Sequence, residues 1–244
     1  MQIITILSLI IAIGETVAQT NPWDPQPGDG DLWQIFHQNL VNQTRRHRVD
    51  ERMIFVGDSL TQYWLILGEP VWAKHYTPRH AYNYGIGGDM TQNVIFRIQN
   101  QEFDGLRPVV TVLMIGGNNF WRTNDTVADV AHGTQEIVNE LLAKMPTTKI
   151  ILLGNIPASI PGLNEKLLQH TALISKLANN RNVYFLEMWT HFLDNNHNQN
   201  LNLYIPDGVH LNELGYEVWQ QTMDPLLNRL YPNIICSRFY SFFC

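Results

Sequence analysis

The sequence predicts an α/β protein, a three-layer sandwich in which helices cover both faces of a parallel five-stranded sheet. From Arg52 onward, short apolar runs rich in β-branched residues alternate with longer segments of helical apolar spacing. The short runs are continuously apolar, which is typical of strands buried on both faces of a parallel sheet. Helical crossovers join such strands, so ligands are expected beyond the strands' carboxyl ends.

Five runs are predicted to form the strands, at 53–57, 81–85, 109–116, 149–155 and 183–188. The segments that directly follow the first three of them are GDSL, GIGGD and GGNN. These loops are therefore the places where functional residues are expected.

Three later segments are predicted to be helices. Apolar residues recur every three or four positions over 127–145, which indicates one buried face, and Thr126 is a candidate cap. A similar spacing runs over 167–177. A last helix is predicted to begin near Asn212 and to end or kink at Pro225.

The length of 244 residues, of which 45% are hydrophobic, favours one domain. We expect a signal peptide at 1–19, an N-terminal extension at 20–48, the main domain at 49–232 and a C-terminal tail at 233–244. Two large aromatic residues, Trp23 and Trp33, indicate that the extension packs at least partly on the domain.

The first residues have the build of a signal peptide. An apolar run from Ile3 to Ile13 is followed by small and polar residues around Thr16 and Ala18, and the run is too short to span a bilayer. We therefore expect secretion to the extracellular space and no membrane span. Two glycosylation patterns, which begin at Asn42 and Asn124, suit that route.

The charge and the cysteines exclude several classes of partner. The formal net charge is -6 and no basic stripe occurs, so nucleic acid and anionic membranes are poor partners. Cys236 and Cys244 lie in the last nine residues, where they neither staple the core nor form a metal cluster. A tail disulfide, an intermolecular bridge and two free thiols all remain open.

Ser59 directly follows the first predicted strand, in Gly57-Asp58-Ser59-Leu60. That place exposes its hydroxyl at the carboxyl edge of the sheet and near a helix N-terminus, where N–H groups stabilise developing negative charge. A GDS triplet alone is more typical of a helix cap. Whether Ser59 is a nucleophile or part of a helix cap therefore depends on the motifs in the rest of the chain.

A candidate base lies near the other end, in Asp207-Gly208-Val209-His210. A serine hydroxyl becomes nucleophilic when an imidazole takes its proton, and a carboxylate on the other ring nitrogen fixes the tautomer. His210 and Asp207 are suited to these two roles. The simpler interpretation is a capping Asp beside a surface His.

Two Gly/Asn-bearing loops lie between these ends, at 83–89 and 115–119. Gly88 allows the backbone to approach a ligand, and the amide of Asn118 is able to donate to an oxyanion. Neither loop has the spacing of a phosphate loop, and each alone is more often a plain turn.

Taken together, the four motifs resemble the SGNH (GDSL-like) hydrolase family, whose named residues correspond to Ser59, Gly88, Asn118 and His210. Within it, GDSL, NYGIGGD, IGGNN and DGVHL are most similar to the catalytic subunits of the intracellular platelet-activating factor acetylhydrolase. The resemblance runs from about Met53 to Leu230.

The resemblance implies a flavodoxin-like fold and ester hydrolysis through an acyl-enzyme, without cofactor or metal. It also implies an oxyanion hole made by the Ser59 N–H, the Gly88 N–H and the Asn118 amide. Gly117 replaces the usual Thr, which leaves acetyl specificity open because the acyl pocket gains room. The candidate pocket residues are Leu60, Gly117 and Val209, and Trp64, Trp72 and Trp121 are either cleft or core residues.

The sequence therefore predicts a secreted carboxylic ester hydrolase for short acyl esters, with acetyl esters the best guess. The small ester substrate is an acetylated phospholipid or an O-acetylated glycan. The alternative is a non-catalytic secreted binding or matrix protein on the same scaffold, which retention of all five site residues disfavours. A homodimer is suggested only by the relatives, which pair their subunits.

Overall fold

The computed structural model describes residues 20–232 and contains one parallel five-stranded sheet, in the order β2-β1-β3-β4-β5. The predicted fold is confirmed. The strands are β1 (Met53–Gly57), β2 (Ala81–Gly85), β3 (Val110–Met114), β4 (Lys149–Leu153) and β5 (Val183–Leu186). The last three strands end two residues earlier than predicted. Residues 115–116, 154–155 and 187–188 therefore belong to the loops at the carboxyl edge.

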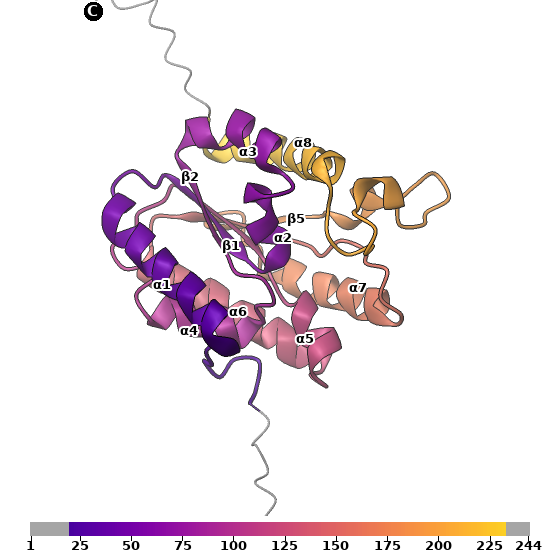
Figure 1. The fold of residues 1–244 in the computed structure, drawn as a ribbon, viewed down its shortest axis with the longest axis horizontal. Helices are drawn as coiled ribbons and strands as arrows, with labels where there is room; N and C mark the ends of the chain where they lie inside the picture. The colour runs from indigo at the N-terminus through magenta and orange to yellow at the C-terminus, as the bar shows by residue number, and fades with distance from the viewer. Residues whose placement is uncertain (1–19, 233–244) are drawn as a thin grey trace, which may run out of the picture.

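Helices form the two outer layers (Figure 1). They are α1 (Gly30–His47), α2 (Ser59–Gln62), α3 (Glu69–His75), α4 (Thr91–Gln99), α5 (Gly117–Arg122), α6 (Val127–Lys144), α7 (Leu163–Ile174) and α8 (Glu213–Leu230). The short 3-10 segments are Tyr63–Leu65, Thr77–Arg79, Ser175–Leu177, Trp189–Phe192 and Leu201–Leu203. Helices α3 and α8 cover one face of the sheet, and α4, α6 and α7 cover the other.

The side chains of β1 alternate between two cores, which explains why the strand is apolar throughout. Met53 and Phe55 pack with α3 and α8, and Ile54 and Val56 pack with α4 and α6. All four side chains are completely buried. Burying each of them contributes on the order of 2 kcal/mol.

Two predicted helix starts are confirmed by their caps. The Thr126 hydroxyl accepts from the Asp129 N–H at the start of α6, and the Asn212 side chain accepts from the Gly215 N–H at the start of α8. Pro225 does not end α8, which continues to Leu230.

The N-terminal segment packs on the domain as a helix that was not predicted. Helix α1 lies beside α4 (Figure 1), and it buries Trp33, Val41 and Thr44. Trp33 contacts the ring of Phe96 from α4. The expectation that this segment packs on the domain is met, and the segment contributes to the site described below.

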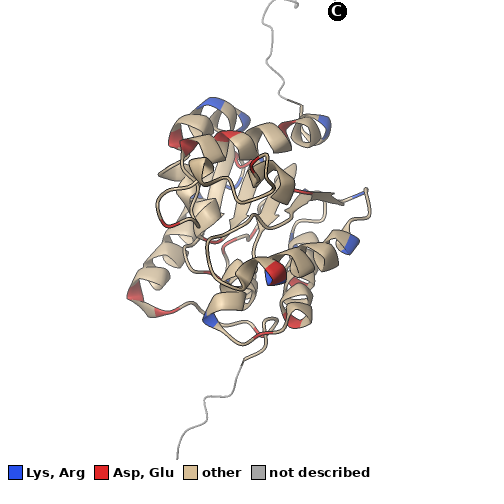
Figure 2. Cartoon of the chain, turned by 90° about the vertical axis from the view of Figure 1, so that its right-hand side faces the viewer, with Lys and Arg blue, Asp and Glu red and all other residues tan. Residues whose placement is uncertain are grey.

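Charged residues are scattered over the face seen in Figure 2, and no basic stripe crosses it. Within residues 20–232, no helix combines the length and hydropathy that a membrane crossing needs. The predicted signal peptide and both cysteines lie outside the described residues. Of the two glycosylation patterns, Asn124 is exposed in a connection, whereas Asn42 is half-buried within α1.

Candidate active site

Three adjacent strands deliver three of the predicted site residues to one edge of the sheet. Ser59 follows β1, Gly88 follows β2 and Asn118 follows β3. Helix α2 sits directly on this edge, so close that a Cβ at Gly85 would collide with the backbone of Gln62. The glycine that ends β2 is thus required for Ser59 to approach the neighbouring strands.

Ser59, His210 and Asp207 form one hydrogen-bonded chain. His210 Nε2 lies 2.9 Å from Ser59 Oγ, and His210 Nδ1 lies 2.6 Å from Asp207 Oδ2. When Asp207 is ionised, Nδ1–H donates to its carboxylate and Nε2 is left to accept from the serine hydroxyl. The arrangement is able to withdraw a proton from Ser59.

The loop that carries Asp207 and His210 is held by its own backbone. The N–H groups of Val209 and His210 donate to Asp207 Oδ1 at 2.8 and 2.9 Å. Burial alone would raise the pKa of Asp207, but the bonds from the His210 ring and from the two N–H groups outweigh it and hold that pKa below its ordinary value. The ring of Tyr63 packs against the imidazole, with centroids 4.8 Å apart.

The loop after β2 is shaped so that one N–H group stays without a partner. Gly88 has φ +82°, a conformation that favours glycine. On one side of it, the Gly87 N–H donates to Gln62 Oε1 at 3.0 Å. No described residue accepts from the Gly88 N–H. The Ser59 N–H lies in the first turn of α2, where N–H groups have no intrahelical acceptor.

Asn118 is the third potential donor, and it lies in the first turn of α5 rather than in a loop. Its Nδ2 donates to the Asp89 carbonyl at 2.9 Å and lies 3.5 Å from Asp58 Oδ2. An amide nitrogen carries two hydrogens: one is held by the Asp89 carbonyl, and the other makes only the long contact with Asp58, which a closer ligand oxygen is able to replace. Asn118 and Ser59 both line the cavities described below.

Asp58 caps the helix that begins at Ser59, where its Oδ1 accepts from the Leu60 N–H at 3.0 Å. Burial raises the pKa of Asp58 to about 7, although the hydrogen bond from Leu60 acts to lower it. A capping role agrees with the sequence interpretation, and the carboxyl is partly neutral near pH 7.

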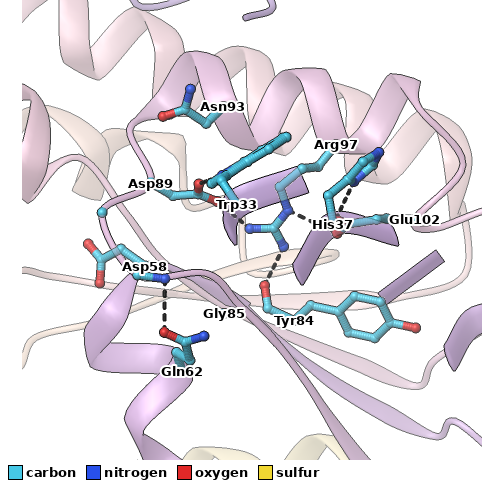
Figure 3. Close-up of polar contacts among 12 residues, drawn as sticks. Trp33, His37, Asp58, Gln62, Tyr84, Gly85, Asp89, Asn93, Arg97 and Glu102 are labelled. Carbon is cyan, nitrogen blue, oxygen red and sulfur yellow. Dashed lines mark hydrogen bonds and ion pairs between the residues drawn. The ribbon is translucent and has the colours of Figure 1, made fainter. Parts of the chain in front are cut away.

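A buried polar network lies behind the Gly88 loop and ties it to α1 (Figure 3). Asp89 accepts from Trp33 Nε1 at 2.6 Å and pairs with the Arg97 guanidinium. Arg97 also donates to Glu102 at 2.9 Å, and Glu102 lies 2.7 Å from His37 Nδ1. Asp89, Arg97 and Glu102 are fully buried, so removing one of them would leave an unpaired charge in the core. Trp33 and His37 of α1 complete the network.

Two cavities meet at Ser59. The smaller has a volume of about 60 Å³, and its wall includes all three candidate pocket residues, Leu60, Gly117 and Val209. The larger has a volume of about 670 Å³ and is reached by both Ser59 and His210. Its lining is mainly apolar and includes Leu32, Phe36, Tyr63, Ile66, Trp121, Ile160 and Val209.

Sequence reasoning missed the contribution of α1 and of the end of α5. Leu32 and Phe36 come from the N-terminal helix, and Arg122 donates to the Gly88 carbonyl. Of the three tryptophans considered for the cleft, Trp64 and Trp72 are buried in the core and Trp121 lines both cavities. Helix α1 mixes buried and exposed apolar residues, so its sequence gives no clear helical stripe, and no local motif marks Arg122.

A second histidine near the smaller cavity has a structural role. His170 is completely buried and hydrogen-bonded to Asn155 at 2.9 Å and Thr134 at 3.1 Å. Burial lowers the pKa of His170 to about 4, so the ring stays neutral. Across residues 20–232, no three His, Cys, Asp or Glu side chains are grouped to hold a metal ion.

A model of the GDSL-like lipase/acylhydrolase family matches residues 55–218, about two thirds of the chain. The chain belongs to this family. One relative of this GDSL-like acylhydrolase, human platelet-activating factor acetylhydrolase IB subunit alpha1, is 31% identical over 222 residues, which are 89% of this chain and 92% of the relative. The human alpha2 subunit is 36% identical over 127 residues, 52% of each chain.

Solved structures show the same fold. A GDSL-like lipase from Bacteroides thetaiotaomicron superposes with a TM-score of 0.64 at 17% identity, covering 80% of this chain and 98% of that one. An acetylxylan esterase from Geobacillus stearothermophilus has a TM-score of 0.58 at 17% identity, with coverages of 74% and 94%. The family and its homologous acetylhydrolases make this GDSL-like protein an acylhydrolase.

Proposed function

We propose that this acylhydrolase is a secreted serine esterase that removes short acyl groups, acetyl above all, through an acyl-enzyme. The observation that carries the proposal is the hydrogen-bonded chain of Asp207, His210 and Ser59, which opens on two cavities of unequal size. The small cavity suits the acyl group and the large one suits the alcohol.

In the proposed reaction, Ser59 Oγ attacks the ester carbonyl and its proton passes to His210 Nε2. The carbonyl oxygen becomes an oxyanion, and the N–H groups of Ser59 and Gly88 and the Asn118 amide are its donors. His210 returns the proton to the departing alcohol. Water then attacks the acyl-enzyme with His210 as base, and the acid leaves as Ser59 regains its proton.

The preference for a short acyl group rests on the size of the small cavity. A volume of about 60 Å³ is well below the roughly 150 Å³ of a cavity that holds benzene. Acetyl is also the group named in the human relative and in the acetylxylan esterase structure. The two candidate substrates are an acetylated phospholipid and an O-acetylated glycan, and the apolar lining of the large cavity favours the lipid.

Secretion is proposed from the apolar run at 3–13. If it is right, the full chain expressed in a secretory host appears in the medium with an N-terminus near residue 20. Recovery from inside the cell with an intact N-terminus would contradict it.

The proposed chemistry is tested with p-nitrophenyl acetate, butyrate and octanoate as substrates. We expect turnover by the wild-type chain that falls with acyl length and drops by at least about a thousandfold in Ser59→Ala. In Asp207→Asn the serine remains but the tautomer is no longer fixed, so kcat falls by a similar order. Equal, negligible rates for wild type and Ser59→Ala would instead favour a non-catalytic binding protein.

A further inference from the structure

Helix α5 carries Asn118 in its first turn and Trp121 one turn later. Trp121 Nε1–H donates to Asn118 Oδ1 at 3.0 Å, and Asn118 Nδ2 donates to the Asp89 carbonyl at 2.9 Å. Both the oxygen and the nitrogen of the Asn118 side-chain amide are therefore held by hydrogen bonds. With the oxygen and one N–H occupied, the second N–H of Asn118, whose remaining acceptor is Asp58 Oδ2 at 3.5 Å, is the one that can turn to a ligand.

Trp121 is placed at the junction of the two cavities. Its side chain lines both of them, together with Ser59 and Asn118, and it is 58% exposed. An indole with this exposure adds little to the core, since the apolar area that it removes from water is limited. Its hydrogen bond to Asn118 and its place in the cavity walls give the residue a role at the site.

Arg122, the residue after Trp121, contacts the loop that carries the Gly88 N–H. Arg122 Nη1 donates to the Gly88 carbonyl at 2.7 Å, and Nη2 lies 3.0 Å from Asp29 of the N-terminal segment. Gln62 Oε1 accepts from the preceding Gly87 N–H. The peptide units before and after the one that carries the Gly88 N–H are thus held, which limits the directions in which this N–H can point.

We propose that Trp121 and Arg122 are positioning residues of the oxyanion site, Trp121 by orienting the Asn118 amide and Arg122 by fixing the Gly88 loop. This rests on the proposed function, because it assumes that Asn118 and Gly88 donate to the oxyanion. Neither residue touches the reacting atoms. Their effect falls on kcat, since the oxyanion exists only in the transition state and the intermediate.

The test for Trp121 is a double-mutant cycle with Asn118. Trp121→Phe keeps an aromatic wall but loses the donor, and we expect kcat to fall about tenfold, part of the roughly hundredfold loss typical of a whole oxyanion donor, with KM little changed. In an Asn118→Ala background the same change should have no further effect, because the amide to be oriented is absent. Trp23→Phe, at a half-buried tryptophan that packs on His132 and lines neither cavity, is the matched control.

A second readout does not depend on turnover. The side-chain amide signal of Asn118, identified in an NMR spectrum by its loss in Asn118→Ala, should move and exchange faster with solvent in Trp121→Phe. Additive losses of kcat in the two backgrounds, or an unchanged amide signal, would overturn the role of Trp121. Failure of the proposed function looks different, since Ser59→Ala would then keep wild-type turnover while the amide signal still reports the orientation.

For Arg122, the decisive comparison is between two variants. Arg122→Ala removes the bond to the Gly88 carbonyl, and we expect kcat to fall about tenfold, whereas Arg122→Lys retains a donor and should recover most of the rate. Asp29→Asn should change kcat by less than about twofold, because that ion pair is exposed. Equal losses in Arg122→Ala and Arg122→Lys, or a change in KM alone, would overturn the positioning role.

Discussion

Gly117 leaves space at the wall of the small cavity. A Cβ built there meets only Leu167 Cδ2, at 3.9 Å, so a side chain fits without a clash. We expect Gly117→Thr to fold normally and to narrow the cavity. Butyrate turnover should then fall about tenfold or more relative to acetate, measured as the ratio of kcat/KM values, because one methylene in such a pocket is worth about 1–3 kcal/mol.

Gly117→Ala provides the intermediate step, and its selectivity should lie between those of glycine and threonine. A melting temperature close to wild type would show that the fold is intact. If acetate and butyrate turnover fell in parallel, the acyl group would not occupy this cavity.

At the residue scale, the sequence was informative where the signal is local. Asp207 and His210 stand three residues apart in one turn, so their pairing could be anticipated from spacing. The contact of Arg122 with Gly88 joins positions 34 residues apart. Such a contact depends on how two loops meet at the sheet edge, and no spacing along the chain encodes it.

At the scale of elements, the attachment of α1 to the sheet contains a buried carboxyl. Glu51 accepts from the Tyr84 hydroxyl of β2 at 2.7 Å, and that hydroxyl lies 2.6 Å from Thr44 Oγ1 of α1. Burial raises the pKa of Glu51 to about 7 from 4.5, and the hydrogen bond from Tyr84 opposes the shift. One carboxyl oxygen of Glu51 has no hydrogen-bond partner among the described residues.

The raised pKa has a definite effect on stability. The folded state keeps the Glu51 proton up to about pH 7, whereas the unfolded chain loses it near 4.5, so rising pH across this window favours unfolding. Glu51→Gln removes this loss and keeps an acceptor for Tyr84. We expect it to stabilise the protein by roughly 1–3 kcal/mol at about pH 8, and by almost nothing below the unfolded pKa.

Urea unfolding of Glu51→Gln and wild type at the two pH values measures this difference. Glu69→Gln, at an exposed position that is not among the causes of the Glu51 pKa shift, controls for the general loss of one negative charge. A stabilisation of equal size at both pH values would show that ionisation of Glu51 is not its cause.

The elements that the sequence predicted well are those with a clear local pattern. The five strands are short apolar runs packed between two layers of helices, and helix α6 has one buried face. Helix α1 is different, because Trp33 and Val41 face the domain whereas Leu32 and Ile35 are exposed, so its apolar residues do not form a single stripe. Helices α4 and α5 were missed as well, and α5 has only six residues, too few to show a period.

Pro225 shows how packing overrides a local rule. Proline removes one N–H from the helix, which leaves the carbonyl of Gln221 without its usual partner. Gln221 is exposed, so water is able to solvate that group. Met223 and Leu227 are fully buried on either side of the proline, and their burial keeps α8 helical to its end.

At the scale of the whole molecule, the two glycosylation patterns are not equivalent. Asn124 is exposed between α5 and α6, whereas Thr44 of the other pattern is buried and its hydroxyl lies within hydrogen-bonding distance of Tyr84 and of the Glu102 carbonyl. If the chain is secreted by a eukaryotic host, we expect a glycan at Asn124. Glycosidase treatment should shift the mobility of wild type and of Asn42→Gln, but not of Asn124→Gln.

The same shift in Asn124→Gln as in wild type would place the glycan elsewhere. No shift in any of the proteins would mean that the chain receives no N-linked glycan in that host.

Different parts of the molecule position the candidate catalytic residues and line the large cavity. Ser59, Gly88 and Asn118 follow three neighbouring strands, so their spacing is set by a sheet whose strands lie about 4.8 Å apart. Leu32 and Phe36 reach the large cavity from the N-terminal helix, outside the sheet. If the large cavity holds the alcohol, as proposed, substitutions at Leu32 and Phe36 are free to alter which alcohol is accepted while the bond-breaking atoms stay in register, and new specificities can evolve on one surface without rebuilding the catalyst.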